Sequence, residues 1–193
     1  MSISLKGQFL IAMPSMGDKR FLESLIYIID HNEEGAMGLV VNNPMQGMQF
    51  LDILREMKLG EEDKLINLSP KIQEREILAG GPVEKGRGFV LHSKDYSQKN
   101  NSLSINDEIS MSATSDVLKA IAFGTPPKKN LFALGYCGWS PMQLEGELKN
   151  NGWLITPHTS ELLFEIPYNE RYDFALSQIG ATRASLSFTA GNA

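Results

Sequence analysis

The residues that could act as nucleophiles or carry protons are few, and they lie far apart in the sequence. The chain has three histidines and one cysteine, at His31, His92, His158 and Cys137. Ser93 follows His92 directly, but neighbours in a strand point to opposite faces, so these two side chains cannot exchange a proton. A hydrolase built from His31, His92, Ser93 or Cys137 would need a site assembled by the fold. The sequence alone therefore names no catalytic residue.

Two short motifs resemble sites for phosphate and for zinc but lack groups that those sites need. Gly81–Gly88 has the glycine spacing of a phosphate-binding loop, yet Arg87 and Gly88 stand where that loop needs a lysine and a hydroxyl residue. His31–Glu33 begins like a zinc-deaminase signature, which also needs a pair of cysteines, and the chain has one cysteine. We therefore expect no ATP binding, no metal site and no cofactor.

The candidate site for a ligand or partner consists of polar and glycine residues, most of them at the ends of expected strands. Strand ends in one sheet can gather their loops at a common edge, where polar groups and bare glycine backbone face a cavity. We expect the segments around His31, Asn42, Gly80 and Trp139 to converge in this way. Turn chemistry explains the same residues equally well, because glycine and asparagine tolerate positive φ. The candidate residues are His31, Asn32, Asn42, Gly80, Gly81, Pro82, His92, Ser93, Gly138 and Trp139.

Trp139 and Cys137 each have two interpretations. Trp139 lies at an expected strand-to-helix junction, where side chains often face a ligand. Aromatic residues nevertheless dominate core packing, so we favour a core role for Trp139. Cys137 precedes an expected helix start that could stabilise a thiolate. Free cysteines are usually buried, so we favour a small buried residue at a strand end.

Short apolar runs bounded by turn residues predict most of the strands. Ser24–Asp30 and Gly38–Asn42 are rich in apolar strand-forming residues, and the turn-forming segment His31–Ala36 lies between them, which indicates a hairpin. Further strands are expected at Gln8–Met13, Ile77–Ala79, Gly88–His92, Leu103–Ile105, Ile109–Met111 and Leu131–Leu134.

Apolar residues at helical spacing and a helix-start motif predict the helices. One helix begins near Gln49, and the others cover Ser115–Phe123, Pro141–Lys149 and Tyr168–Ile179. Ser140, Pro141 and Gln143 have the order of a capping serine, a first-turn proline and a glutamine that caps in return. The third helix should therefore begin at Pro141, and Ser140 is better explained as its cap than as a nucleophile. Gly60–Ser69 is expected to be a charged connection.

The fold class follows from the composition and the order of the elements. With 193 residues, 42% of them hydrophobic and 21% charged, the chain can bury one continuous core. The expected strands come in adjacent pairs and the helices arrive irregularly, so the rhythm of a doubly wound parallel sheet is missing. We predict a single α+β domain over residues 1–180, with mixed or antiparallel sheets and flanking helices. Residues 181–193 are expected to form a frayed tail.

Charge and cysteine content limit the partners and the compartment. The net charge of −5 and the lack of a basic recognition helix weigh against direct sequence-specific binding of nucleic acid. No window approaches the roughly 20 apolar residues of a membrane-spanning helix, so no membrane association is expected. The first twenty residues lack a signal peptide and the lone cysteine cannot form an internal disulfide, which predicts a cytoplasmic protein.

Ordered sequence blocks extend along nearly the whole chain: Gly7–Pro14, Phe21–Tyr27, His31–Asn32, Gly35–Asn42, Gly80–Val83, Arg87–Ser93, Ser115–Leu118, Leu134–Tyr136, Gly138–Trp139 and Gln143–Glu145. Together these blocks resemble the YqgE/AlgH family, an uncharacterised group of bacterial proteins. The resemblance implies a compact α+β fold and a bacterial source, and it supplies no catalytic residues. The regulatory label of some members, which connects them to transcription of exopolysaccharide genes, does not imply contact with DNA. Met142 departs from the pattern, because the family has a glycine before Gln-Leu-Glu.

Two hypotheses of function follow. The first is a non-enzymatic regulatory module that binds a small ligand or a protein partner, with a possible indirect role in transcriptional regulation. The second is an enzyme with an unfamiliar site, such as a hydrolase that uses His31, His92, Ser93 or Cys137. The missing catalytic signatures favour the binding module.

Overall fold

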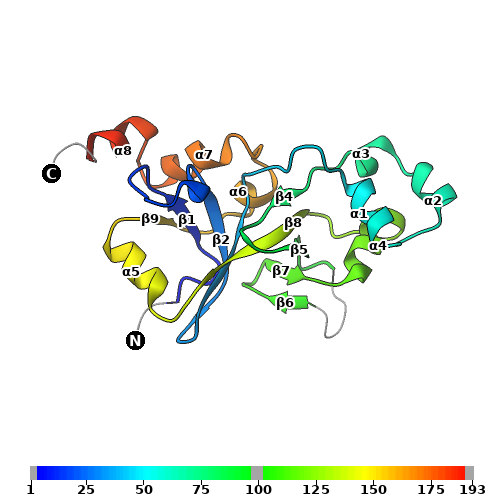
Figure 1. Ribbon diagram of the computed structural model, residues 1–193, viewed down its shortest axis with the longest axis horizontal. Coiled ribbons are helices and arrows are strands. Elements are labelled where there is room, and N and C mark those ends of the chain that lie inside the picture. The colour runs from blue at the N-terminus through cyan, green and yellow to red at the C-terminus, as the bar shows by residue number, and fades with distance from the viewer. Residues whose placement is uncertain (1–3, 97–101, 190–193) are drawn as a thin grey trace.

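One curled sheet of nine strands runs through the computed structural model, which describes residues 4–96 and 102–189 (Figure 1). The strand order is β6-β7-β5-β8-β3-β2-β1-β9, and neighbours on this path are antiparallel, while β4 joins β8 in parallel. The predicted α+β class with antiparallel pairing is thereby confirmed. The strands are β1 (Phe9–Ala12), β2 (Leu25–Asn32), β3 (Gly35–Val40), β4 (Leu78–Ala79), β5 (Val83–Ser93), β6 (Ser102–Ser104), β7 (Ile109–Ser112), β8 (Asn130–Trp139) and β9 (Trp153–Thr156).

The predicted hairpin is present as β2 and β3. Asn32 pairs with Gly35, so the turn between the two strands consists of Glu33 and Glu34. Gly35 has a φ of 132°, and a β-carbon there would lie 2.1 Å from the carbonyl oxygen of Trp139. The bare glycine therefore allows the hairpin to lie directly against the end of β8.

Strand β8 is longer than predicted and connects the two halves of the sheet. Its first residues pair with β5 and its last three pair with β3. The prediction ended at Leu134, but the strand continues to Trp139 and includes Gly135, which has a φ of 73°. This extension places Cys137 and Trp139 in the sheet rather than in a loop.

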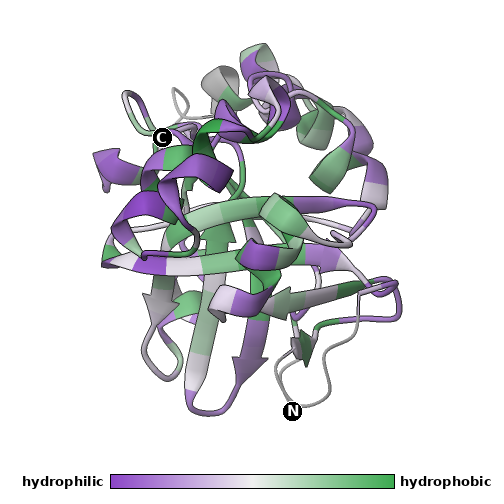
Figure 2. Cartoon of the chain, turned by 90° about the vertical axis from the view of Figure 1, so that its right-hand side faces the viewer, coloured by the Kyte–Doolittle hydropathy of each residue, from purple (hydrophilic) through white to green (hydrophobic). Residues whose placement is uncertain are grey.

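The helices divide between the two ends of the molecule, and alternate strand residues face them on opposite sides of the sheet. Figure 1 shows α1 to α4 together at one end and α5, α7 and α8 towards the other. In β1, Phe9 and Ile11 face a core that includes α6 and α7, whereas Leu10 and Ala12 face a core that includes α5. Figure 2 shows hydrophobic colour along the central strands and hydrophilic colour on the loops at their ends.

Helix positions agree with the sequence where the apolar spacing is clear. The bounds of α4 are as predicted, and α1 and α7 lie within or near the predicted ranges. Helix α2 lies within the segment expected to be a charged connection, and α3 follows directly after it. Helix α6 and strand β9 were not predicted. The helices are α1 (Phe50–Glu56), α2 (Glu62–Ile66), α3 (Pro70–Gln73), α4 (Ser115–Phe123), α5 (Gln143–Lys149), α6 (Ser160–Phe164), α7 (Arg171–Gln178) and α8 (Arg183–Thr189), with one short 3-10 helix, η1 (Lys19–Phe21).

The expected frayed tail is partly helical. Arg183–Thr189 form α8, Leu186 is buried in the core, and Arg183 makes an ion pair with Asp173 on α7. A second ion pair joins Arg183 to Glu23, so α8 is attached to the domain by one buried apolar residue and two ion pairs. Residues 190–193 lie outside the described part of the chain.

Helix α5 begins two residues later than predicted. Its N-cap is Met142 rather than Ser140, and Pro141 lies in the preceding turn. The backbone amide of Ser140 still donates to Oε1 of Gln143 over 3.0 Å, which is half of the predicted capping box. The other half of the capping box, a bond from a side-chain oxygen of the N-cap residue, is absent. The N-cap Met142 instead has a left-handed backbone, with a φ of 63°.

We predict that Met142→Gly stabilises the protein. A side chain in the left-handed region costs about 1–2 kcal/mol, and the greater freedom of glycine in the unfolded chain offsets part of this, leaving about 0.5–1 kcal/mol. Urea denaturation measures the change. Met57→Gly is the matched control, because Met57 is also exposed but has a φ of −80°, so glycine there should destabilise. A lower midpoint for Met142→Gly would contradict the prediction.

No helix among residues 4–96 and 102–189 has the length and apolar character needed to cross a membrane.

Candidate functional site

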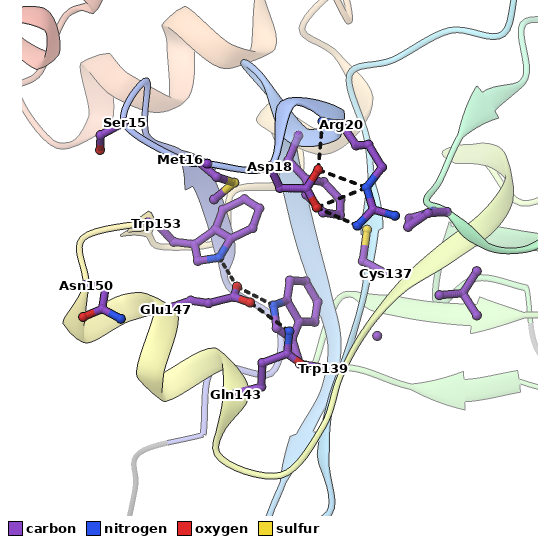
Figure 3. Close-up of a pocket in the computed structure, with 16 residues that line it drawn as sticks. Ser15, Met16, Asp18, Arg20, Cys137, Trp139, Gln143, Glu147, Asn150 and Trp153 are labelled. Atoms are coloured by element: carbon purple, nitrogen blue, oxygen red, sulfur yellow. Dashed lines mark hydrogen bonds and ion pairs between the residues drawn. The ribbon is translucent and has the colours of Figure 1, made fainter.

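A cavity of about 560 Å³ opens between η1, the end of β8, α5 and the start of β9. This volume lies within the range typical of small-molecule sites. Its walls combine apolar and aromatic side chains with polar and charged ones in similar proportion (Figure 3). The apolar side chains that line it belong to Met16, Phe21, Pro82, Val83, Trp139 and Trp153.

A single carboxylate holds the two tryptophans of the chain. Oε2 of Glu147 accepts hydrogen bonds from Nε1 of Trp139 over 2.8 Å and from Nε1 of Trp153 over 2.7 Å. Oε1 accepts from Nε2 of Gln143 over 2.9 Å. Figure 3 shows this carboxylate between the two indoles, whose ring centroids are 6.0 Å apart in an edge-to-face arrangement. Charge-assisted bonds of this kind fix both rings as walls of the cavity.

The local chain path explains why these groups meet. Trp139 is the last residue of β8, Glu147 lies on α5, and Trp153 is the first residue of β9. The strand-helix-strand connection is short, and Leu144 on α5 packs into the same core as both tryptophans. Burial of that helix face turns Glu147 towards the indoles.

An ion pair lies at the edge of the cavity. Nε of Arg20 donates to Oδ1 of Asp18 over 3.0 Å, and Nη2 donates to Oδ2 over 2.6 Å. The hydrogen bond from Arg20 lowers the pKa of Asp18, and the same bond raises the pKa of Arg20. Both groups are solvent-accessible, so the pair adds little stability. It does hold the guanidinium near Cys137 (Figure 3).

Cys137 lines the cavity but is poorly suited to nucleophilic chemistry. Its side chain is buried, and Sγ donates to the carbonyl oxygen of Gly80 over 3.5 Å. Burial raises the pKa of the thiol to about 12, so the protonated form dominates at neutral pH. The favoured interpretation of a small buried residue agrees with this geometry.

Part of the candidate set lies together in this cavity. Pro82, Gly138 and Trp139 line it, whereas Gly80 and Gly81 directly precede Pro82 and contact β8 without lining the cavity. The carbonyl of Gly80 accepts from the amide of Val40, and a β-carbon at Gly81 would lie 2.1 Å from the carbonyl carbon of Tyr136. The glycines therefore bring Pro82 against β8.

Three other candidates, His31, Asn32 and Asn42, are not among the residues that line the cavity. Nδ1 of His31 accepts from the amide of Leu5 over 3.0 Å, so Nε2 carries the proton and donates to Oε1 of Glu145 over 3.0 Å.

Both asparagines hold local backbone. Oδ1 of Asn32 accepts from the amide of Glu34 over 2.8 Å. Asn42 bridges the start of β2, because its Oδ1 accepts from the amide of Leu25 and its Nδ2 donates to the carbonyl of Glu23, both over 2.8 Å. The predicted convergence thus brings together the Gly80 and Trp139 segments, whereas His31, Asn32 and Asn42 secure strand ends.

His92 and Ser93 belong to the other half of the sheet. Nδ1 of His92 donates to the carbonyl of Ser93 over 2.9 Å, which leaves Nε2 to accept from Oγ of Ser112 over 2.9 Å. Oγ of Ser93 bonds to Asp95 and accepts from the amide of Lys129. His31, Cys137 and the His92–Ser93 pair therefore have separate hydrogen-bond partners.

We predict that His92 makes the protein less stable in mild acid. Burial lowers its pKa below the ordinary 6.5. Between pH 6.5 and the lower pKa of the folded protein, His92 binds a proton in the unfolded chain but not in the folded one. The free energy of unfolding therefore decreases as pH falls through this range. Urea midpoints at about pH 7.5 and about pH 5.5 should therefore differ more for the wild type than for His92→Gln. Equal pH dependence of the two proteins would show that His92 contributes nothing.

Five charged or aromatic residues line the cavity beside Trp139, and none of them was selected from the sequence as a site residue: Asp18, Arg20, Phe21, Glu147 and Trp153. A usable signal exists for two of them, because the only other tryptophan and an intervening glutamate follow Trp139 across one helix. No local pattern points to Asp18 and Arg20. Among the described residues, no three histidine, cysteine or acidic side chains gather to hold a metal ion.

The sequence of this chain is similar to those of known proteins. A family model described as AlgH-like matches residues 9–184. A UPF0301 protein of Rhodopseudomonas palustris is 47% identical over 189 residues, which cover 98% of this chain and 87% of the relative. A UPF0301 protein of Azorhizobium caulinodans is 48% identical, with 98% and 92% covered.

Two solved structures share the fold. The solution structure of the AlgH protein from Pseudomonas aeruginosa superposes with a TM-score of 0.79 at 40% identity, covering 100% of this chain and 96% of that one. A crystal structure of a protein from Corynebacterium diphtheriae gives a TM-score of 0.65 at 15% identity, with 91% and 87% covered. The second match supports the fold alone.

Proposed function

This chain belongs to the AlgH-like family, and from its tryptophan-walled cavity we propose that it is a binding module for a small planar molecule rather than an enzyme. The observation that carries the proposal is the position of Glu147, which fixes Trp139 and Trp153 around one space. Rigid aromatic walls with a few oriented polar groups are typical of small-molecule sites.

The hydrogen-bonding capacity of the cavity narrows the ligand class. A carboxylate has about four acceptor positions, and Glu147 uses two on Oε2 and one on Oε1. One acceptor position on Oε1 remains for a ligand N–H group. Arg20 directs Nε and Nη2 to Asp18, which leaves Nη1 as a donor. These groups suit a planar heteroaromatic molecule with a hydrogen-bond donor and an acceptor.

The alternative of a hydrolase has less support. His31, His92 and Ser93 are bonded to other partners, and Cys137 is a buried, protonated thiol. Ser112 donates to Nε2 of His92, but both side chains are buried and neither lines the cavity with the two tryptophans. Oγ of Ser93 bonds to Asp95 and to backbone groups of Lys129, and no histidine is its partner.

We further propose a regulatory role in the cytoplasm, exerted through the bound ligand or a protein partner and without direct sequence-specific contact to nucleic acid. The net charge of −5 supports the last point, because phosphate backbones require a local excess of positive charge. A lone cysteine, Cys137, fits a reducing compartment.

Calorimetry with defined probes tests the proposal. Adenine and nicotinamide are planar and carry donors and acceptors, benzoate is planar without a donor, and cyclohexylamine has a donor but no aromatic ring. We expect at least one of the first two to bind more tightly than both others. Trp139→Ala should weaken that binding by roughly tenfold or more. If the probes bind equally, or if folded Trp139→Ala binds as well as the wild type, the proposal is wrong.

A further inference from the structure

A second cavity, of about 290 Å³, lies between α3, the start of β8 and the start of α7. It shares no lining residue with the tryptophan cavity. Three cationic side chains, Lys71, Arg75 and Arg171, line it, and Glu76 is the one acidic residue that does so. The chain as a whole has a net charge of −5, so this cavity differs from it in having a local excess of positive charge.

Arg171, the first residue of α7, is 8% exposed. Its Nε donates to the carbonyl oxygen of Ile166 over 2.9 Å and its Nη1 donates to that of Val41 over 2.5 Å. Both acceptors are uncharged backbone groups, and they fix the guanidinium without neutralising it. Burial lowers the pKa of Arg171 to about 10, so it stays charged at neutral pH.

Arg75 is held in the same manner. Its Nη2 donates to the backbone carbonyl of Asn130 over 2.7 Å and also to Oδ1 of Asn130. Burial lowers the pKa of this guanidinium as well. Lys71 is exposed at the edge of the cavity on α3. Two arginines held by hydrogen bonds and one exposed lysine therefore line one space.

Glu76 lines the cavity but forms no ion pair with its cations in the described part of the chain. Across residues 4–96 and 102–189, no ion pair involves Lys71, Arg75 or Arg171. The charge of Glu76 acts on Arg171, but Glu76 also forms a hydrogen bond with Tyr168 that raises the pKa of the tyrosine. Buried cations in proteins are normally paired, because an uncompensated charge is costly.

We propose that this cavity is a binding site for a phosphate group, held by Arg75 and Arg171 with Lys71 at its entrance. Planar guanidinium groups match phosphate oxygens and can donate two parallel bonds. Nη2 of Arg171 makes no hydrogen bond within the described chain, and it is available to the anion. The volume suits a single phosphate group or the phosphate end of a larger molecule. Inorganic phosphate and a phosphate monoester share this chemistry.

Isothermal titration of the full chain with inorganic phosphate, at constant ionic strength set with chloride, tests the site. We expect saturable binding, and Arg75→Gln should weaken it by roughly tenfold, the effect of losing one charge-assisted hydrogen bond. Lys71→Gln should weaken it less. Lys149→Gln, an exposed lysine on α5, is the matched control and should bind like the wild type.

Arg171→Gln is not needed for the decision, because a buried substitution can unfold the chain. Glycerol phosphate and adenosine monophosphate, titrated in competition with phosphate, identify the source of the group: tighter binding of a monoester assigns the site to the phosphate end of a larger ligand. Absence of saturable phosphate and monoester binding would overturn the proposal. Equal affinity of folded Arg75→Gln and wild type would also overturn it.

Discussion

Glu147→Leu will lower the free energy of unfolding by about 2–4 kcal/mol, because two buried donors lose their acceptor at about 1–3 kcal/mol each. The indoles of Trp139 and Trp153 are 7% and 3% exposed, so water cannot easily replace the carboxylate. Gln143 loses a partner on the same helix. Urea denaturation followed by circular dichroism measures the loss without relying on the tryptophans themselves.

Glu147→Gln separates the acceptor from the charge. Its amide oxygen can accept from both indoles, while its amide nitrogen would face the Nε2 donor of Gln143. We expect a loss smaller than about half that of the leucine variant. If leucine and glutamine cost the same, the indole hydrogen bonds do not stabilise the fold as described.

Gly81→Ala will lower the free energy of unfolding by more than about 3 kcal/mol or prevent folding. The added β-carbon would lie 2.1 Å from the carbonyl carbon of Tyr136, 2.2 Å from its oxygen and 2.5 Å from the amide nitrogen of Cys137. These are backbone atoms of β8, so no side-chain rotation can relieve the contacts. The yield of folded protein and the urea midpoint measure the effect.

Gly86→Ala is the matched control for Gly81→Ala. Both glycines lie in the same short segment, but a β-carbon at Gly86 meets nothing within 4 Å. The control should change stability by less than about 1 kcal/mol. Wild-type stability in Gly81→Ala would mean that the segment does not lie against β8.

Much of the fold could be predicted because its signals are local. The bounds of α4 follow from its apolar stripe and the glycine after Phe123, and the β2–β3 hairpin follows from its turn residues. Predictions failed where tertiary packing overrides local signals. Gly135 and Gly138 indicate a strand end, yet pairing with β3 and β5 continues β8 through both.

The candidate site was likewise predicted only in part. Trp139, Gly138 and Pro82 were selected because they lie at strand ends, and they line the cavity. His31 and Asn42 carry the same kind of local signal, but their side chains hold nearby backbone instead. Turn chemistry and ligand binding use the same residue types, so the sequence cannot separate them.

The proton-correlated nitrogen spectrum of the two indoles tests the proposed binding site most directly. The chain has two tryptophans, so the spectrum contains two indole signals, and both indoles line the cavity. We predict that adenine or nicotinamide, whichever binds by calorimetry, shifts both indole signals with one common dissociation constant. Saturable binding that leaves both indole signals unchanged would contradict the assignment of this cavity as the ligand site.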